Sequence, residues 1–168
     1  MIPLTILSLQ EARGASARRE VYTHAIQILD DPRDYEVWPR LSARSLRLTF
    51  DDVLDAPEHF SDKSSDGGCT EQDIARLIAF AGTLDAGSRL VCHCHAGLSR
   101  SPAAALIALS VLAGAGTEAE CYRIVTGAAP ESVPNIRMLK MADRLLRRNG
   151  ALASPEILIH EAYRNSRE

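Results

Sequence analysis

The chain has 168 residues, of which 46% are hydrophobic, and a formal net charge of −3 at pH 7. This length and apolar content suffice for a substantial core, so we expect residues 1–168 to form a single domain. The weak negative charge excludes the basic footprint of a nucleic-acid-binding protein. Because no apolar run is long enough to span a bilayer, we also expect no membrane partner. Four cysteines without a secretory signal favour a reducing cytoplasm over a disulfide framework.

The first half of the chain is dominated by short alternating apolar segments. These predict strands over residues 4–9, 23–29 and 45–50, with a short helical turn at 10–13. Trp38 lies in the loop before the third strand, where we expect it to pack against the protein rather than contact a substrate.

The second half reads as a series of helices. A capping-box pattern at Thr70–Asp73 predicts a helix to about Leu84, and residues 102–112 are apolar nearly all round, which is typical of a buried central helix. Further helices are expected after a second capping box at Thr117–Glu120, from Pro134 to Gly150, and over about 155–165. Four arginines of the Pro134 helix indicate a solvated face: Arg137, Arg144, Arg147 and Arg148.

The segment Val91–Pro102 joins an apolar strand to a helix through a tight loop. Pro102 suits the first helical position, where its missing N–H costs no hydrogen bond. Backbone amides converge in such a loop, and the positive end of the helix dipole lies behind them. The segment therefore predicts an anion-binding cradle.

This cradle carries a thiol, Cys94, and a guanidinium, Arg100. The amides, the helix N-terminus and the guanidinium all favour the thiolate, which is the nucleophilic form of cysteine. Arg100 can grip two oxygens of a phosphoryl group in a bidentate fork. Ser101 is placed to hydrogen-bond the sulfur, and Gly97 lets the backbone bend close to a ligand. His93 would hold the loop from behind.

Two other interpretations of this segment remain open. Cys92, His93, Cys94 and His95 could form a metal cluster, but cysteines and histidines face opposite sides of a strand, and a second ligand pair at finger spacing is absent from the sequence. The loop could also bind phosphate without catalysing a reaction.

The sequence His93-Cys94, five residues, then Arg100-Ser101 resembles the signature loop of the cysteine-dependent protein tyrosine phosphatases. Because Ala96-Gly97 follows the cysteine and histidine, the loop is most similar to that of the dual-specificity branch of this family. Over about residues 23–150 the chain resembles the compact tyrosine phosphatases of bacteria. The resemblance implies an α/β fold with a mostly parallel central sheet flanked by helices on both faces. It also implies no metal or cofactor. Substrate oxygens would be held by the loop residues His95, Ala96, Gly97, Leu98, Ser99 and Arg100.

The resemblance further implies a general acid on the loop after the third strand. The second of two paired aspartates, Asp52, stands at the matching place, 42 residues before Cys94, which is longer than the usual interval. Asp51, Asp55 and Asp62 remain alternatives. Asn135, after a proline, matches the residue that braces the signature loop, and it can equally serve as a plain helix cap.

The expected reaction is therefore hydrolysis of a phosphomonoester through a phosphocysteine intermediate, with a phosphoprotein as substrate. The loop carries no added lysine, which disfavours the alternative of an inositol phosphate or phosphoinositide. A phosphate-binding interaction module, or a persulfide or arsenate enzyme, are the alternatives outside phosphatases. Cys92 or Cys69 could form a reversible disulfide with Cys94.

Overall fold

The protein is described here by a computed structural model that covers residues 1–30, 38–54 and 67–154. Within these residues the sheet has four strands: β1 (Leu4–Leu7), β2 (His24–Leu29), β3 (Arg44–Thr49) and β4 (Leu90–His93). They lie in the order β1-β4-β2-β3, and every neighbouring pair is parallel. The α/β fold with a parallel central sheet is confirmed.

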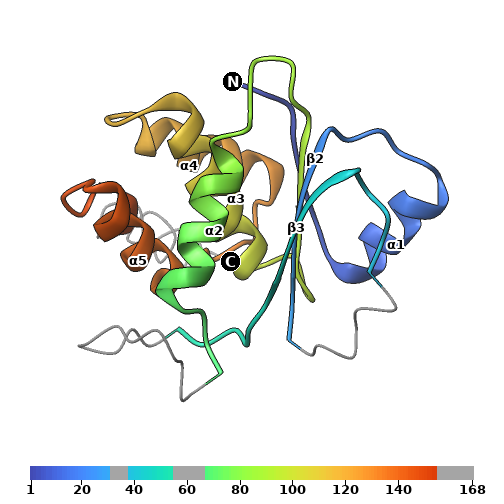
Figure 1. The fold of residues 1–168 in the computed structure, drawn as a ribbon, viewed down its shortest axis with the longest axis horizontal. Coiled ribbons are helices and arrows are strands. Elements are labelled where there is room, and N and C mark those ends of the chain that lie inside the picture. The colour runs from blue at the N-terminus through green and yellow to red at the C-terminus, as the bar shows by residue number, and fades with distance from the viewer. Residues whose placement is uncertain (31–37, 55–66, 155–168) are drawn as a thin grey trace.

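Helices cover both faces of the sheet, as predicted (Figure 1). One face carries α1 (Leu9–Ala17), and the other carries four helices and a short 3-10 turn. These are α2 (Glu71–Ala81), α3 (Arg100–Ala113), α4 (Glu118–Ala128), α5 (Ile136–Leu146) and η2 (Ala151–Ala153).

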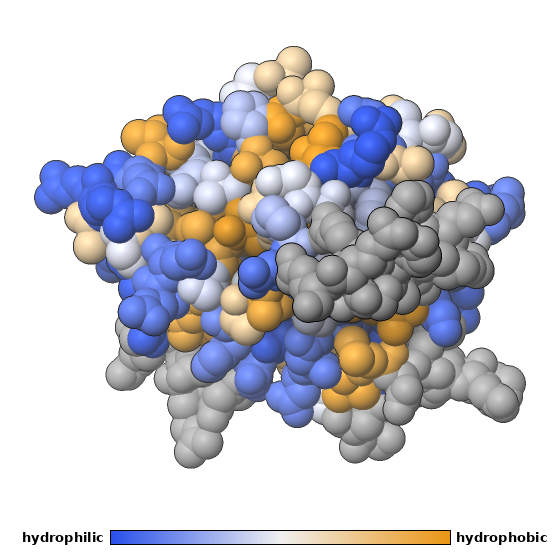
Figure 2. All heavy atoms as spheres, turned by 180° about the vertical axis from the view of Figure 1, so that it is seen from behind, coloured by the Kyte–Doolittle hydropathy of each residue, from blue (hydrophilic) through white to orange (hydrophobic). Residues whose placement is uncertain are grey.

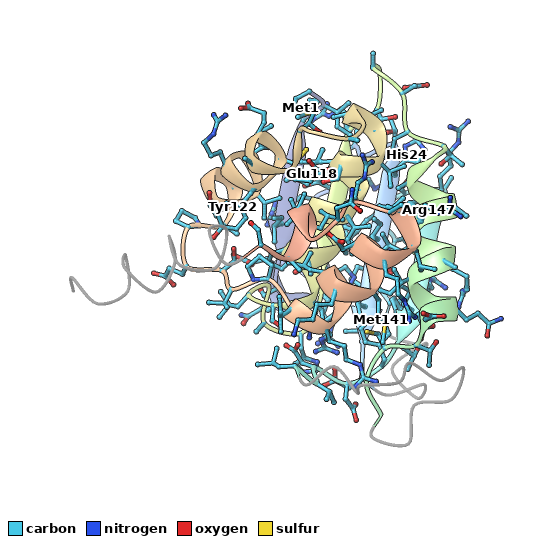
Figure 3. All side chains as sticks on the ribbon, turned by 90° about the vertical axis from the view of Figure 1, so that its left-hand side faces the viewer. Met1, His24, Glu118, Tyr122, Met141 and Arg147 are labelled. Carbon is cyan, nitrogen blue, oxygen red and sulfur yellow. The ribbon has the colours of Figure 1, made fainter. Side chains whose placement is uncertain are left out.

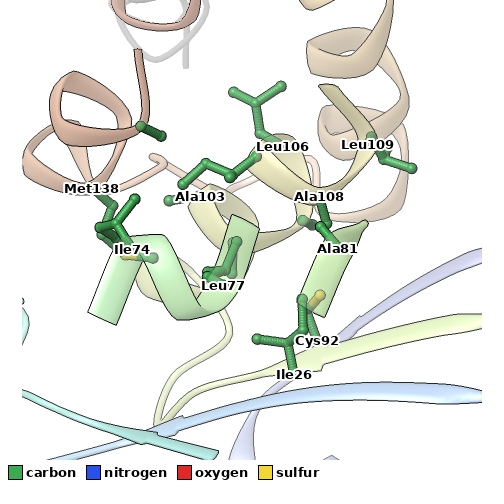
Figure 4. Packing of buried hydrophobic residues seen from close by; sticks show 14 of the residues in the cluster. Ile26, Ile74, Leu77, Ala81, Cys92, Ala103, Leu106, Ala108, Leu109 and Met138 are labelled. Atoms are coloured by element: carbon green, nitrogen blue, oxygen red, sulfur yellow. The ribbon is translucent and has the colours of Figure 1, made fainter. Parts of the chain in front are cut away.

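Alternation along the strands explains why both faces need a cover. Ala25 and Val91 point to the α1 face, where they pack with Ala12, Ala15 and Leu41. Their neighbours in the chain, Ile26 and Cys92, point to the opposite face and join the main core (Figure 4). Because side chains of a strand alternate between the two faces, apolar residues at successive positions bury both faces.

Helix α3 is the centre of the main core. Every residue from Arg100 to Ser110 is buried, which confirms the predicted central helix. It packs against α2, α4 and α5, and Figure 3 shows the helical layer in front of the sheet. A helix enclosed on all sides needs apolar residues all round, which is the pattern in the sequence.

Several predicted boundaries are wrong: α2 ends at Ala81 and α5 at Leu146, each before its predicted end, and two helix starts are also misplaced. The first strand ends at Leu7 rather than at residue 9, because Ser8 and Glu11 form a capping box that starts α1. The expected turn at 10–13 is thus a nine-residue helix. Helix α3 begins at Arg100, two residues before Pro102, which is tolerated because amides of the first turn have no partner within a helix.

One of the two predicted capping boxes is present. The hydroxyl of Thr70 accepts from the amide of Asp73, whose carboxylate accepts from the amide of Thr70. Thr117, in contrast, makes no side-chain cap and donates to the carbonyl of Gly114 over 2.7 Å.

The predicted solvated arginine face is wrong at two of its positions. Arg137 is only 2% exposed and donates from Nε to the carbonyl of Cys69 over 3.2 Å. Arg148 lies 3.5 Å from Glu118, an acid labelled in Figure 3, and both side chains are buried below 10% exposure. Both side chains are buried because α5 and the residues after it lie against the core, and each guanidinium has an acceptor there.

Trp38 is 6% exposed and lies under the guanidinium of Arg47, so it packs as expected. The helix predicted over 155–165 falls outside the described residues. In the part of the chain that is described, no helix has the length and apolar character needed to cross a membrane. On the face drawn in Figure 2, apolar patches alternate with charged side chains.

Candidate active site

The loop of residues 94–100 joins β4 to α3 at the carboxyl edge of the sheet. Because all four strands are parallel, the residues that follow each of them reach this same edge. The edge therefore gathers Ser8 after β1, Asp30 after β2 and Phe50 after β3 around the loop, where they contact Gly97 or Arg100.

Three backbone hydrogen bonds from distant segments hold the loop in place. The amide of Leu9 donates to the carbonyl of His95 over 3.0 Å, and that of Val133 donates to Leu98 over 2.8 Å. The amide of Asn135 donates to the carbonyl of Ser99 over 3.1 Å. The loop is thus clamped on one side by the start of α1 and on the other by the segment before α5.

Gly97 is required at its position for two reasons. Its φ is +81°, and a Cβ there would lie 2.9 Å from the backbone nitrogen of Ser8. The close neighbour is thus the β1–α1 junction, whereas the sequence led us to expect close approach to a ligand.

Cys94 lies at the base of the loop and is 1% exposed. Its Sγ accepts a hydrogen bond from the amide of Gly97 over 3.2 Å, and it lies 3.2 Å from Oγ of Ser101. The loop thus brings Ser101 to the sulfur, as predicted. The exposed positions of the rim are His95, Ala96 and Leu98.

The guanidinium of Arg100 is also at the base, with the residue 3% exposed. Its Nη1 donates to the carbonyl of Phe50 over 2.8 Å and to the carboxylate of Asp30. Its Nε is buried and has no hydrogen-bond partner among the described residues. The carboxylate oxygen Oδ2 of Asp52 lies 3.8 Å from this nitrogen, beyond hydrogen-bond distance, so Nε can still donate to an acceptor.

Asp52 bridges the loop and the segment before α5. Its Oδ1 accepts from Oγ of Ser99 and from Nδ2 of Asn135, each over 2.7 Å, and its Oδ2 lies 3.8 Å from Nε of Arg100. The Asn135 side chain also accepts from the amide of Met138 over 3.0 Å, which caps α5. The predicted helix cap is therefore confirmed. Among the described residues, the side chain of Asn135 reaches the loop only through Asp52, so its bracing role stays a prediction.

The other candidate acids differ in position. The amide of Asp51 donates to the carbonyl of Gly67 over 2.8 Å, and its carboxyl group lies against Gly67 rather than the loop. Asp55 and Asp62 lie outside the described residues. Of the four aspartates proposed from the sequence, Asp52 is the one with described contacts to the loop.

His93 lies behind the loop, where its side chain is completely buried. Its ring centroid is 6.2 Å from that of Trp38. Burial lowers the pKa of His93 to about 4, so the imidazole is neutral near pH 7. This location agrees with a supporting position, and the supporting role itself stays a prediction.

The remaining cysteines are buried in the core. Burial raises the pKa of Cys69 to about 12, and Sγ of this residue lies 3.8 Å from Sδ of Met141. Burial also raises the pKa of Cys92. Both thiols are therefore poor attacking groups, and a disulfide with Cys94 stays an untested prediction. Within residues 1–30, 38–54 and 67–154, no three acidic, histidine or cysteine side chains are grouped to hold a metal ion.

Asp30 is the site residue that sequence reasoning missed. Its Oδ1 accepts from Arg100, and its Oδ2 lies 4.0 Å from Nδ1 of His95. A signal was present, since Asp30 directly follows an apolar strand and the ends of parallel strands share one edge. The order of the strands was needed to place β2 beside β4.

The arrangement of strands, loop and helices matches solved phosphatase structures. Human DUSP28 superposes with a TM-score of 0.59 and 18% identity, over 86% of this chain and 88% of that one. DUSP15 gives a TM-score of 0.58 and 16% identity, over 94% and 91% of the two chains. The chain has the fold of the dual-specificity phosphatases.

The same fold occurs in PTPMT1, whose complex with PI(5)P matches with a TM-score of 0.54 and 16% identity, over 90% of this chain and 95% of that one. No protein-family model and no curated protein matches the sequence. The dual-specificity phosphatase fold is therefore established by structure, and the chemistry of the loop has to be argued from this chain's own residues.

Proposed function

We propose that this protein hydrolyses phosphomonoesters through a phosphocysteine intermediate, with a phosphoprotein as substrate. One observation carries the proposal: the loop that holds the sulfur of Cys94 also holds a buried guanidinium donor, Nε of Arg100, which has no hydrogen-bond acceptor among the described residues. A phosphoryl oxygen is the acceptor that fits this donor and the loop amides.

In the first step the thiolate of Cys94 attacks phosphorus, and the bond between phosphorus and the ester oxygen breaks. The leaving oxygen takes a proton from Asp52, whose Oδ1 is held by Ser99 and Asn135 while Oδ2 lies on the side of Arg100. Arg100 and the loop amides hold the other phosphoryl oxygens and stabilise the charge in the transition state.

In the second step water attacks the phosphorus of the phosphocysteine, and Asp52 takes a proton from that water. The bond between sulfur and phosphorus breaks, which returns the thiolate and releases inorganic phosphate. Ser101, 3.2 Å from the sulfur, is placed to donate a hydrogen bond to it as it leaves. The positive field comes from the loop and Arg100, so the proposed steps need no metal ion.

A phosphoprotein is favoured over a phosphoinositide by the charge around the loop. The exposed rim positions His95, Ala96 and Leu98 include no lysine or arginine, and Asp30 and Asp52 add negative charge beside them. A ligand with a second phosphate would gain little there. The similarity of fold to PTPMT1, solved with PI(5)P, makes a phosphoinositide the second candidate.

The first test is turnover of p-nitrophenyl phosphate by the wild-type protein, with and without a chelator. We expect hydrolysis that the chelator leaves unchanged, and a phosphorylated protein that can be trapped by rapid acid quenching. Binding of phosphopeptide without turnover would instead indicate an interaction module, and activity in a sulfurtransferase assay alone would indicate persulfide chemistry. Phosphopeptide and PI(5)P substrates compared side by side would rank the two candidate classes.

Asp52→Asn should slow hydrolysis of esters with poor leaving groups, because an amide cannot donate the required proton. The amide oxygen can still accept from Ser99 and Asn135, so the loop contacts are kept. We expect a loss of about 10²- to 10⁴-fold in kcat/KM on phenyl phosphate, and a much smaller loss in kcat/KM on esters of strongly acidic phenols. The slope of log kcat/KM against leaving-group pKa is the measurement, because kcat/KM reports the steps up to loss of the leaving group and excludes hydrolysis of the phosphocysteine.

Asp51→Asn is the matched control, since it removes the neighbouring charge and leaves the described loop contacts of Asp52 in place. If Asp52→Asn lowered kcat/KM equally for all esters, Asp52 would not be the acid, and the assignment would pass to Asp55 or Asp62.

A further inference from the structure

Two acceptors determine the orientation of the Arg100 side chain. Nη1 carries two hydrogens, and it donates both, to the carbonyl of Phe50 and to the carboxylate of Asp30. The planar guanidinium then has a fixed direction, because anchoring one nitrogen of the fork sets the positions of the others. Nε is the buried donor that makes no hydrogen bond in the described part of the chain.

Asp30 reaches Arg100 from a neighbouring strand. It follows β2, which pairs with β4 in the register Ile26 to Cys92 and Gln27 to His93. The side chain of Asp30 is 44% exposed, while that of Arg100 is 4% exposed. The carboxylate therefore lies between the buried base of the loop and its exposed rim, where its second oxygen is 4.0 Å from Nδ1 of His95.

The alternative partner of the guanidinium is Asp52, whose Oδ2 is already 3.8 Å from Nε. A buried guanidinium without a counter-charge is strongly disfavoured, so it would move toward the nearest carboxylate. Without Asp30, that carboxylate is Asp52. In that position Nε would donate to Asp52 instead of to the phosphoryl group. Asp52, the proposed general acid, would then be held in an ion pair with Arg100.

We propose that Asp30 is a positioning residue, which holds Nη1 of Arg100 so that Nε faces the phosphoryl site and forms no hydrogen bond with Asp52. The inference rests on the proposed function, because it takes the bound anion to be a phosphoryl group. Asp30 acts through Arg100, and we assign it no proton transfer.

The test compares Asp30→Ala and Asp30→Asn with the wild type in calorimetric binding of inorganic phosphate and orthovanadate. We expect Asp30→Ala to weaken binding of both anions by about 10- to 100-fold, the size of effect seen when a binding group is misplaced by about 1 Å. Asp30→Asn should lose less, because an amide oxygen still accepts from Nη1. Glu120→Ala is the matched control, since it removes a carboxylate from an exposed ion pair with Arg123 on α4.

A double-mutant cycle separates positioning from a structural role. If Asp30 acts through Arg100, Asp30→Ala should weaken phosphate binding in the wild-type background and leave it unchanged in an Arg100→Ala background. Equal losses in both backgrounds would refute the proposal. Asp30→Asn keeps the measurement possible if Asp30→Ala does not fold, since it preserves size and an acceptor.

Two further results would also overturn the proposal. Tighter phosphate binding by Asp30→Ala would show that the carboxylate competes with the ligand for Arg100. Unchanged binding with slower hydrolysis of poor leaving groups only would make Asp30 the general acid.

Binding is measured without turnover, so the outcome is independent of the proposed hydrolysis. A wild type that binds phosphate and shows the coupling, yet hydrolyses nothing, would refute the proposed function and leave the positioning of Arg100 standing. If the wild type hydrolyses esters and Asp30→Ala leaves phosphate binding unchanged, the proposed function stands and the positioning role of Asp30 is refuted. Absence of phosphate binding by the wild type would overturn both.

Discussion

Cys94→Ser is expected to abolish hydrolysis and to preserve phosphate binding. A serine hydroxyl is far less acidic than a thiol, and the proposed mechanism provides no base to activate it. The loss in kcat should be on the order of 10⁴-fold or more, as expected when a covalent nucleophile is removed. Phosphate affinity should change little, because the amide of Gly97 and the guanidinium of Arg100 remain in place. The measurements are kcat on an aryl phosphate and calorimetric binding of inorganic phosphate.

Cys121→Ser is the matched control for this experiment. Cys121 is also completely buried, and its sulfur lies 3.7 Å from Oγ1 of Thr117, so a hydroxyl there has a polar partner. The control should keep wild-type turnover. Retained hydrolysis by Cys94→Ser would remove Cys94 as the nucleophile and with it the phosphocysteine intermediate.

Arg100→Lys is expected to weaken both phosphate binding and turnover, although the charge is kept. A lysine carries its charge at one point and cannot donate to the carbonyl of Phe50, the carboxylate of Asp30 and a ligand in one plane. We expect a loss of about 10²- to 10³-fold in kcat/KM, comparable with removal of one oxyanion donor. Phosphate affinity should fall in parallel, which distinguishes this variant from Cys94→Ser.

Arg123→Lys, at a side chain that is 70% exposed, controls for the exchange of arginine for lysine as such. Melting temperatures of all variants should accompany the kinetics, because Arg100 is buried and its replacement can cost stability. Unchanged phosphate affinity in folded Arg100→Lys would contradict the role of the guanidinium fork.

The parts of this protein that can be predicted from sequence are those whose cause is local. Cys94 and Arg100 lie six residues apart in one contiguous loop, so their proximity follows from the chain itself. The capping box of Thr70 and Asp73 and the all-round apolarity of α3 are equally local, and both predictions are confirmed. The local pattern misled at Thr117, because its hydroxyl donates to the carbonyl of Gly114 instead of capping α4.

Burial of charged side chains is the clearest case that sequence could not resolve. The sequence around Arg137 and Arg148 is typical of a solvated helix face. In the structure each arginine lies against the core with an acceptor at hydrogen-bond distance. An arginine is buried where the tertiary structure supplies an acceptor or a counter-charge, and those partners, Cys69 and Ser110, come from distant elements.

The amino-acid sequence alone determined the loop between β4 and α3, its sulfur and its guanidinium, and the alternation of strands and helices around them. The tertiary structure decided which distant residues join the loop: Asp30 from the end of β2, Asp52 after β3 and Asn135 before α5. The physical reason is that the order β1-β4-β2-β3 brings the ends of separate parallel strands to one edge. That order depends on long-range packing, which no local pattern of residues encodes.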